Sequence, residues 1–209
     1  MVESSNKDQT KRKITEVQTF CVPYDLAEIK ENFTITTNTP SQPSKEQIIN
    51  QAFQLHSQGK IQEAAKYYQQ IINQGFNDYR VFSNFGMILN NLGQLQDAEL
   101  SYRKAIEIKP DFADSHYNLG NILRDLGKLQ DAELSYLKAI QINPDFAEAH
   151  SNLGSILNNL GQLQDAELSY RKAIEINPDF ADAYSNLGNV LKDLGKLQKA
   201  ELSYRKAIE

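Results

Sequence analysis

The sequence predicts an all-α fold, a solenoid of antiparallel helix hairpins that follows a mostly irregular N-terminal segment. Three observations predict this fold class. The phrase NLGSILNNLG at 152–161 recurs with small changes at intervals of 34 residues along the 209-residue chain. Apolar residues follow helical spacing on both sides of the phrase, and glycine or proline stands at each expected helix end. Repetition with such a period indicates stacked helical units.

The recurrence divides the chain into an N-terminal segment and five units. The expected boundaries are, in chain order, 1–44, 45–78, 79–112, 113–146, 147–180 and 181–209. The first of these ranges is rich in polar and turn-forming residues, so we expect it to be largely disordered and to end in a linker. The last unit is incomplete.

Each unit is expected to contain two helices joined by a turn at one glycine. In the fourth unit the first apolar pattern ends at Leu160 and the second begins at Leu163, with Gly161 between them. Glycine adopts at little cost the left-handed conformation that often follows a helix. Because the connection is so short, the two helices must lie antiparallel.

Proline marks the end of the second helix. The sequence NPDF at 143–146, and again 34 residues later, places proline where it stops a helix. The aspartates that follow, Asp145 and Asp179, are predicted to cap the next helix by accepting hydrogen bonds from its free amides. Small residues such as Gly120 and Ala132 are predicted at the crossing of the paired helices, where larger side chains would separate the backbones.

These positions resemble the tetratricopeptide repeat. The pattern is carried in the third unit by His116, Leu119, Gly120, Leu123, Gly127, Leu129, Ala132, Tyr136, Ala139 and Pro144. The resemblance covers about three quarters of the chain. The first unit departs from it, since Gln51 and Ala52 replace the Leu-Gly pair and Phe76 occupies the proline position. The resemblance implies a right-handed superhelix whose inner, concave surface is formed by the first helix of each unit.

Composition argues against several classes of function. The formal net charge is −5 and basic residues do not cluster widely, which argues against a nucleic-acid partner. No apolar run approaches the roughly 20 residues that cross a bilayer, and the polar start lacks the apolar core of a secretory signal. We therefore expect no membrane association and a cytoplasmic location. Cys21 is the single cysteine, so the chain cannot assemble a thiolate metal site.

No residue pattern indicates catalysis. The chain lacks the phosphate-binding, metallopeptidase and nucleophile-elbow motifs. We expect no catalytic residue, no metal, no cofactor and no enzymatic activity. The pairs Glu99/Arg103 and Glu167/Arg171 in the second helices are interpreted as i,i+4 ion pairs on a solvated face.

One polar column is constant in all five units, and it consists of Asn50, Asn84, Asn118, Asn152 and Asn186. An amide side chain has a donor and an acceptor that match a peptide group, so the column is predicted to hold an extended peptide by its backbone. Further peptide-binding candidates in the first helices are Tyr117, Asn121, Arg124, Asn158, Asn189 and Lys192.

The asparagine column resembles the one in the superhelix of the O-linked N-acetylglucosamine transferases, which binds extended peptide. A structural role for the asparagines stays open. The segment Ile88–Ile108 is identical to Ile156–Ile176. Duplication of units therefore accounts for much of the uniformity without a ligand.

The leading functional hypothesis is a non-catalytic scaffold for protein–protein interaction that binds an extended peptide or a partner helix on its concave face. The alternative is the N-terminal targeting part of a larger enzyme, of the glycosyltransferase or sulfotransferase type, whose catalytic domain is absent from this chain. The sequence stops at Glu209 with Leu197, Tyr204 and Ile208 on an uncovered flank. Self-association through this uncapped repeat is a third possibility.

Overall fold

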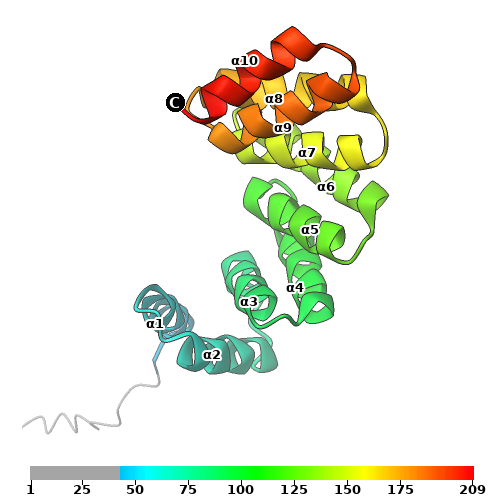
Figure 1. The fold of residues 1–209 in the computed structure, drawn as a ribbon. Helices are drawn as coiled ribbons and strands as arrows, with labels where there is room; N and C mark the ends of the chain where they lie inside the picture. Colours follow the sequence, from blue (N-terminus) through cyan, green and yellow to red (C-terminus); the bar gives the residue numbers. More distant parts are fainter. Residues whose placement is uncertain (1–42) are drawn as a thin grey trace, which may run out of the picture. The chain divides into compact units, whose positions relative to one another are not determined.

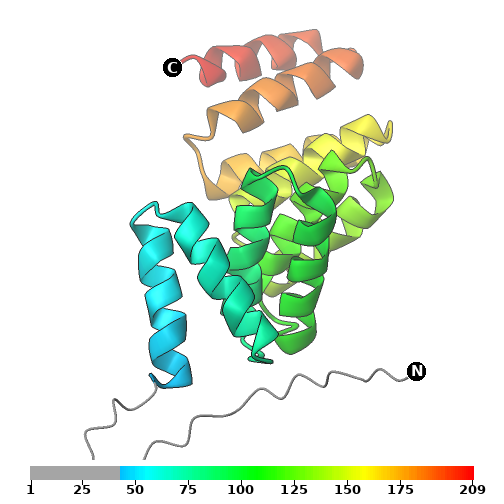
Figure 2. The same cartoon turned by 90° about the horizontal axis from the view of Figure 1, so that it is seen from below.

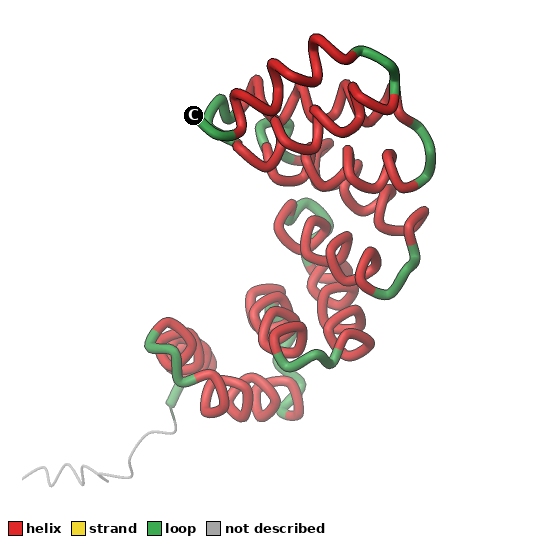
Figure 3. The backbone as a smooth tube through the Cα atoms, in the orientation of Figure 1, coloured by secondary structure: helices red, strands yellow, loops and turns green. Residues whose placement is uncertain are grey.

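The computed structural model describes residues 43–209, which fold into ten helices joined by short loops (Figures 1 and 3). The helices are α1 Lys45–Ser57, α2 Ile61–Asn73, α3 Tyr79–Asn91, α4 Leu95–Ile108, α5 Ala113–Asp125, α6 Leu129–Ile142, α7 Ala147–Asn159, α8 Leu163–Ile176, α9 Ala181–Asp193 and α10 Leu197–Ala207. The described part of the chain contains no strand. The predicted all-α solenoid is therefore confirmed. The expected irregular segment 1–44, with Cys21, lies outside the described residues except for its last two positions.

The helices pack as five consecutive antiparallel pairs, as the pair α9–α10 shows in Figure 2. Each pair contacts the next one through its second helix, and α3 also contacts α5 as α7 contacts α9. Odd-numbered helices therefore form one layer and even-numbered helices the other. We call the exposed sides of these layers the first-helix face and the second-helix face. None of the ten helices in residues 43–209 has the length and apolar character of a bilayer-spanning helix.

The turn inside each pair requires glycine because of its backbone conformation. Gly161 has φ 76°, and a Cβ atom there would meet nothing within 4 Å, so space is not the constraint. The amides of Gly161 and Gln162 donate to the carbonyls of Asn158 and Leu157 at 2.9 and 2.8 Å, which satisfies the end of α7. The same positive φ occurs at Gly59, Gly93, Gly127 and Gly195.

The predicted capping of the later first helices by aspartate is wrong. Helices α7 and α9 have Phe146 and Phe180 at their N-cap positions and no side-chain cap. Asp145 lies one residue too early to reach the free amides of α7. Instead, the Asn143 side chain accepts from the Asp145 amide at 3.3 Å and holds the turn. Helices α7 and α9 therefore begin without a side-chain cap.

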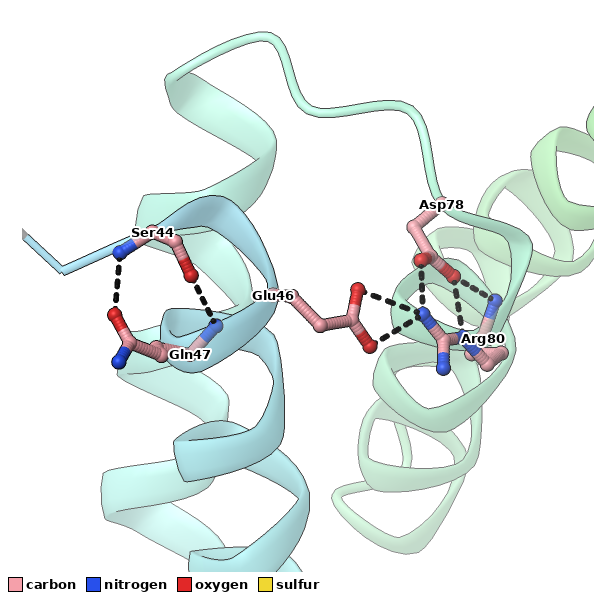
Figure 4. A network of polar contacts seen from close by, with 5 residues as sticks. All are labelled: Ser44, Glu46, Gln47, Asp78 and Arg80. Atoms are coloured by element: carbon pink, nitrogen blue, oxygen red, sulfur yellow. Dashed lines mark hydrogen bonds and ion pairs between the residues drawn. The ribbon is translucent and has the colours of Figure 1, made fainter.

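Side-chain caps occur at the two helices that begin differently (Figure 4). Ser44 and Gln47 form a reciprocal capping box at α1. Asp78 caps α3 through the Arg80 amide at 2.9 Å and also accepts from the Arg80 guanidinium at 2.7 Å. Arg80 reaches back to Glu46 in α1 at 3.3 Å, so this polar group links the first helices of the first two units.

The core repeats with the sequence. Each second helix buries an alanine, and in the first four units it also buries, four residues later, a tyrosine that packs against the first helix of the same pair. The buried members are Ala64, Ala98, Ala132, Ala166, Ala200, Tyr68, Tyr102, Tyr136 and Tyr170, with exposed fractions of 0 to 3%.

Glycine in the first helix makes room for the tyrosine ring. A Cβ atom on Gly120 would lie 2.6 Å from Cε1 of Tyr136, closer than van der Waals contact allows. The same atom on Gly154 would lie 3.0 Å from the Tyr170 ring. The predicted close crossing at small residues is therefore a contact between a glycine and an aromatic ring.

Ion pairs connect successive second helices, which corrects the interpretation of this face as merely solvated. Glu167 is 12% exposed and pairs with Arg171 at 2.9 Å within α8 and with Lys196 of the next unit at 2.6 Å. Glu99 pairs with Lys128 in the same way at 2.8 Å. Burial raises the pKa of Glu167, but hydrogen bonds from Lys196 and Arg171 outweigh it and hold the pKa below its ordinary value.

The Glu–Lys ion pair between successive units is missing between the third and fourth units. Glu133 takes the place of Glu99 there, but Gln162 replaces lysine, and among residues 43–209 Glu133 forms no ion pair. Between the first two units, Ala65 and Gln94 replace both partners. The units are therefore linked alternately with and without this ion pair.

The glycine–tyrosine contact predicts that alanine substitutions at Gly120 and Gly154 lower the stability to different extents. Gly120→Ala should lower the free energy of unfolding by about 1–3 kcal/mol through overpacking, despite the roughly 1 kcal/mol that alanine gains in helix propensity. Gly154→Ala should cost less, because its Cβ contact is longer. Urea unfolding followed by circular dichroism measures both. Equal stabilities of the two variants would contradict the ring contact as the cause.

The missing ion pair predicts a stabilising substitution. Gln162→Lys should pair with Glu133 and raise the free energy of unfolding at neutral pH by up to about 1 kcal/mol. Pairing lowers the folded-state pKa of a carboxyl group, so the gain should be present above the unfolded pKa and lost as the pH falls through the folded value.

Gln94→Lys is the matched control, because it faces Ala65 instead of a carboxylate. Urea titrations at neutral and acidic pH compare the two variants. A similar gain in both would mean that the ion pair is not its source.

Candidate functional site

The five column asparagines lie on the odd-numbered helices, one in each. Asn50 is exposed and Asn84, Asn118, Asn152 and Asn186 are partly buried. Their amides therefore reach the first-helix face. The surroundings of each amide nevertheless differ.

Two members of the column are engaged inside the fold. The Asn84 amide donates to the Arg80 carbonyl in the preceding turn at 3.0 Å. Asn152 donates to the Tyr117 hydroxyl at 3.2 Å and to the Asn121 side-chain oxygen at 2.9 Å. Both amide hydrogens of Asn152 are thus used, which leaves its oxygen for a ligand. Within residues 43–209, the side chains of Asn50, Asn118 and Asn186 form no hydrogen bond.

Asn152 belongs to a polar cluster that joins the third and fourth units. The cluster consists of Tyr117 and Asn121 in α5, Tyr136 in α6 and Asn152 in α7. Tyr136 donates to the Asn121 oxygen at 2.7 Å. Burial raises the pKa of Tyr136 far above its ordinary value, so the phenol keeps the proton that it donates. The Tyr117 ring also stacks on Phe146, with centroids 4.7 Å apart.

The other predicted site residues have varied surroundings. Arg124 is 35% exposed and is held by the neighbouring Asp125 at 2.9 Å. Asn189 accepts from the Tyr204 hydroxyl at 2.8 Å. Asn158 is partly buried, and Lys192 is exposed and forms no ion pair with another described residue. The structure therefore brings Tyr117, Asn121 and Asn152 into direct contact but leaves these others as separate points along the face.

The sequence analysis missed a pocket on the same face, between the first two units. Its lining consists of Phe53, His56, Ser57, Tyr68, Asn84 and Met87, and its volume is about 300 Å³. The Nδ1 atom of His56 lies 3.1 Å from the Tyr68 hydroxyl, and burial lowers the His56 pKa, which favours the neutral ring. Met87 is 39% exposed at the mouth. The pocket is therefore apolar and carries no formal charge near neutral pH.

In the sequence, this pocket is indicated by residues of the first two units that differ from those at the same positions in the later repeats. Phe53 and His56 stand where the third unit has Asn121 and Arg124, and Met87 stands where the fourth has Ser155. One face thus changes from apolar at the first two units to polar at the third and fourth.

Each of the three histidines contacts another group of the protein. Among residues 43–209, no group of three or more His, Cys, Asp or Glu side chains could hold a metal ion. The histidines of α5 and α7 serve the backbone, since Nε2 of His116 lies 2.9 Å from the Pro110 carbonyl and Nε2 of His150 lies 3.0 Å from that of Pro144.

Comparison with solved structures places the fold among known solenoids. A crystal structure of MamA is 24% identical, covers 75% of this chain and 92% of its own, and has a TM-score of 0.71. MamA from Desulfovibrio magneticus RS-1 is 21% identical, with 78% and 93% covered and a TM-score of 0.72. YrrB, described as a TPR protein with an unusual peptide-binding site, is 24% identical, with 79% and 85% covered and a TM-score of 0.70. At these identities the likeness shows the shared fold.

Comparison with known sequences gives the family. No curated protein sequence matches the chain. The family model of the TPR repeat matches residues 86–123, 120–161 and 154–195, which together span more than half of the chain. Since the helix pairs and their spacing agree with this match, the chain belongs to the tetratricopeptide-repeat family.

Proposed function

We propose that the chain is a non-catalytic interaction scaffold that binds an extended peptide of a partner protein on its first-helix face. The proposal rests on the order in which a pocket and free amide groups follow one another along this face. An uncharged apolar pocket at the first two units is followed by Asn118, whose amide has no partner among residues 43–209, and then by the Asn152 oxygen. Exposed amide groups at repeat spacing suit the backbone of an extended segment.

The apolar pocket would give this binding its specificity. Its volume of about 300 Å³ admits one large apolar side chain. Burial of a charged side chain would be costly there, because none of the residues that line the pocket carries a formal charge. We infer that the bound segment carries an aromatic or large aliphatic residue at the end that meets the first two units. The backbone contacts of the column tolerate many sequences, whereas this side chain selects among them.

The similarity to YrrB is consistent with this proposal but does not carry it. That protein is described as having an unusual peptide-binding site. Its 24% identity to this chain leaves the residues of the site to be judged from this structure alone.

Asn118 and Asn152 should respond differently to truncation. Peptides selected from a random library with the full chain provide the ligand, and fluorescence anisotropy measures its affinity. Asn118→Ala should weaken binding by roughly fivefold, the equivalent of about 1 kcal/mol for a lost hydrogen bond, without changing stability. Asn152→Ala should also destabilise the fold by about 1 kcal/mol, because it removes the partner of Tyr117 and Asn121. If Asn118→Ala leaves the affinity unchanged, the amide column does not bind the peptide.

The pocket should be the more sensitive part of the site. Met87→Asp introduces a carboxylate at the exposed mouth and should reduce the affinity at least tenfold, while the unfolding midpoint stays the same. Leu92→Asp is a matched control, since Leu92 is 57% exposed in the same unit but does not line the pocket. Selected peptides that lack a common large apolar residue would contradict the pocket's role.

A further inference from the structure

A row of exposed leucines runs along the second-helix face. Leu100, Leu134, Leu168 and Leu202 occupy the same position in α4, α6, α8 and α10, and 63 to 67% of each is exposed. A single exposed leucine is ordinary, but here one recurs at the same position in four second helices. These leucines stay outside the core, where alanines and tyrosines of the second helices pack against leucines and isoleucines of the first helices. The described part of the chain leaves the row largely uncovered.

Each leucine of the row borders a groove between successive second helices. The groove beside Leu100 has a volume of about 710 Å³ and also exposes Phe85 and Ile72. The grooves beside Leu134, Leu168 and Leu202 measure about 390, 320 and 400 Å³. The leucines and the grooves thus have the same spacing, because one repeat generates both.

The leucines lie between two rows of opposite charge. An aspartate precedes the leucine by three residues and a lysine follows it by four, so all three project from one side of the helix. The triplets are Asp97–Leu100–Lys104, Asp131–Leu134–Lys138 and Asp165–Leu168–Lys172. In α10 the first member is Lys199. The rows run across the helices α4, α6 and α8, with negative charge toward the helix starts and positive charge toward the ends.

The lysines are available for new contacts. Lys104 and Lys172 pair with Glu107 and Glu175 one turn later, at 2.7 and 2.8 Å. These ion pairs are local and largely exposed, and such pairs contribute little. Lys138 contacts the uncharged Gln141. Exchange of these contacts for an ion pair with another chain would cost little.

We propose that the second-helix face binds a second copy of this chain, with a two-fold axis along the leucine row. This rotation places each second helix antiparallel to its counterpart. Because the first helices form the concave side of the superhelix, the second-helix face is convex (Figure 1). The contact is therefore centred on Leu134 of α6 and Leu168 of α8, where the aspartates face the lysines of the other copy. A two-fold axis parallel to the helices would instead oppose aspartate with aspartate. Charge complementarity therefore selects one arrangement of the two copies.

A second copy fits this face because it carries the same leucines at the same spacing, together with the complementary charges. The two-fold arrangement also closes the assembly at two copies, as is usual for isologous contacts. It leaves the first-helix face open, so it does not depend on peptide binding there.

Sedimentation velocity of the full chain tests the proposal. Wild type should shift from monomer to dimer as its concentration rises from micromolar to millimolar. Leu134→Glu with Leu168→Glu should remain monomeric over this range, with an unchanged circular dichroism spectrum because both side chains are exposed. Ile208→Glu is the control, since Ile208 is 86% exposed but lies outside the row; it should dimerise as wild type does.

Charge reversal tests whether the charged rows of the two copies face each other. One variant carries lysine at positions 97, 131 and 165, and a second carries aspartate at positions 104, 138 and 172. Each alone should be monomeric, and an equimolar mixture should form a heterodimer. A wild-type chain that stays monomeric at millimolar concentration overturns the proposal. A mixture that stays monomeric also overturns it. The proposal is likewise wrong if wild type forms assemblies larger than a dimer and Ile208→Glu abolishes them, because the contact would then lie at the end of the array.

Discussion

The contact between a first-helix glycine and a second-helix tyrosine ring is the constraint on which the rest of the structure depends. It sets how closely the two helices of a pair approach, and it directs the tyrosine toward the first-helix face. In three units the tyrosine hydroxyl then meets a polar side chain. Tyr136 donates to Asn121 and Tyr204 donates to Asn189. In the first unit, where Ala52 replaces the glycine, the Tyr68 hydroxyl meets His56. The second unit has Met87 at the position of Asn121, so core packing favours a polar residue there without requiring it.

The hydrogen bonds to these tyrosines distinguish asparagines that stabilise the fold from asparagines that are free to bind a ligand. Asn121 and Asn189 satisfy phenols of the core, and Asn152 uses its hydrogens within the cluster that joins the third and fourth units. A buried hydroxyl or amide without a partner is costly, so these residues are retained for the fold whether or not a ligand binds. The Asn118 side chain has no hydrogen-bond partner among the described residues, so the fold does not require it. The uniform column thus contains asparagines that stabilise the fold and asparagines that are free to bind a ligand.

The sequence was sufficient for the solenoid because every determinant of it is local. Glycine at the turns, proline after the second helix and helical apolar spacing each act within a few residues. The capping prediction was wrong for a similarly local reason, since Phe146 occupies the N-cap and Asp145 lies one position before it. What could not be predicted depends on contacts between units. Glu167 looks like half of an i,i+4 pair until Lys196 of the next unit is placed beside it, and the pocket at Phe53 and Met87 requires two helices from different units.

The two layers of helices give the chain two independent surfaces. A substitution that faces outward from an odd-numbered helix changes the first-helix face, and one that faces outward from an even-numbered helix changes the second-helix face. The tyrosine core between them stays the same. The divergence of the first unit produces an apolar pocket on one face, where Met87 is exposed. On the other face it produces a groove of about 710 Å³, where Ala65 and Gln94 replace an ion pair. Because neither change disturbs the glycine–tyrosine contact in the later units, specificity can vary on either face without loss of the fold.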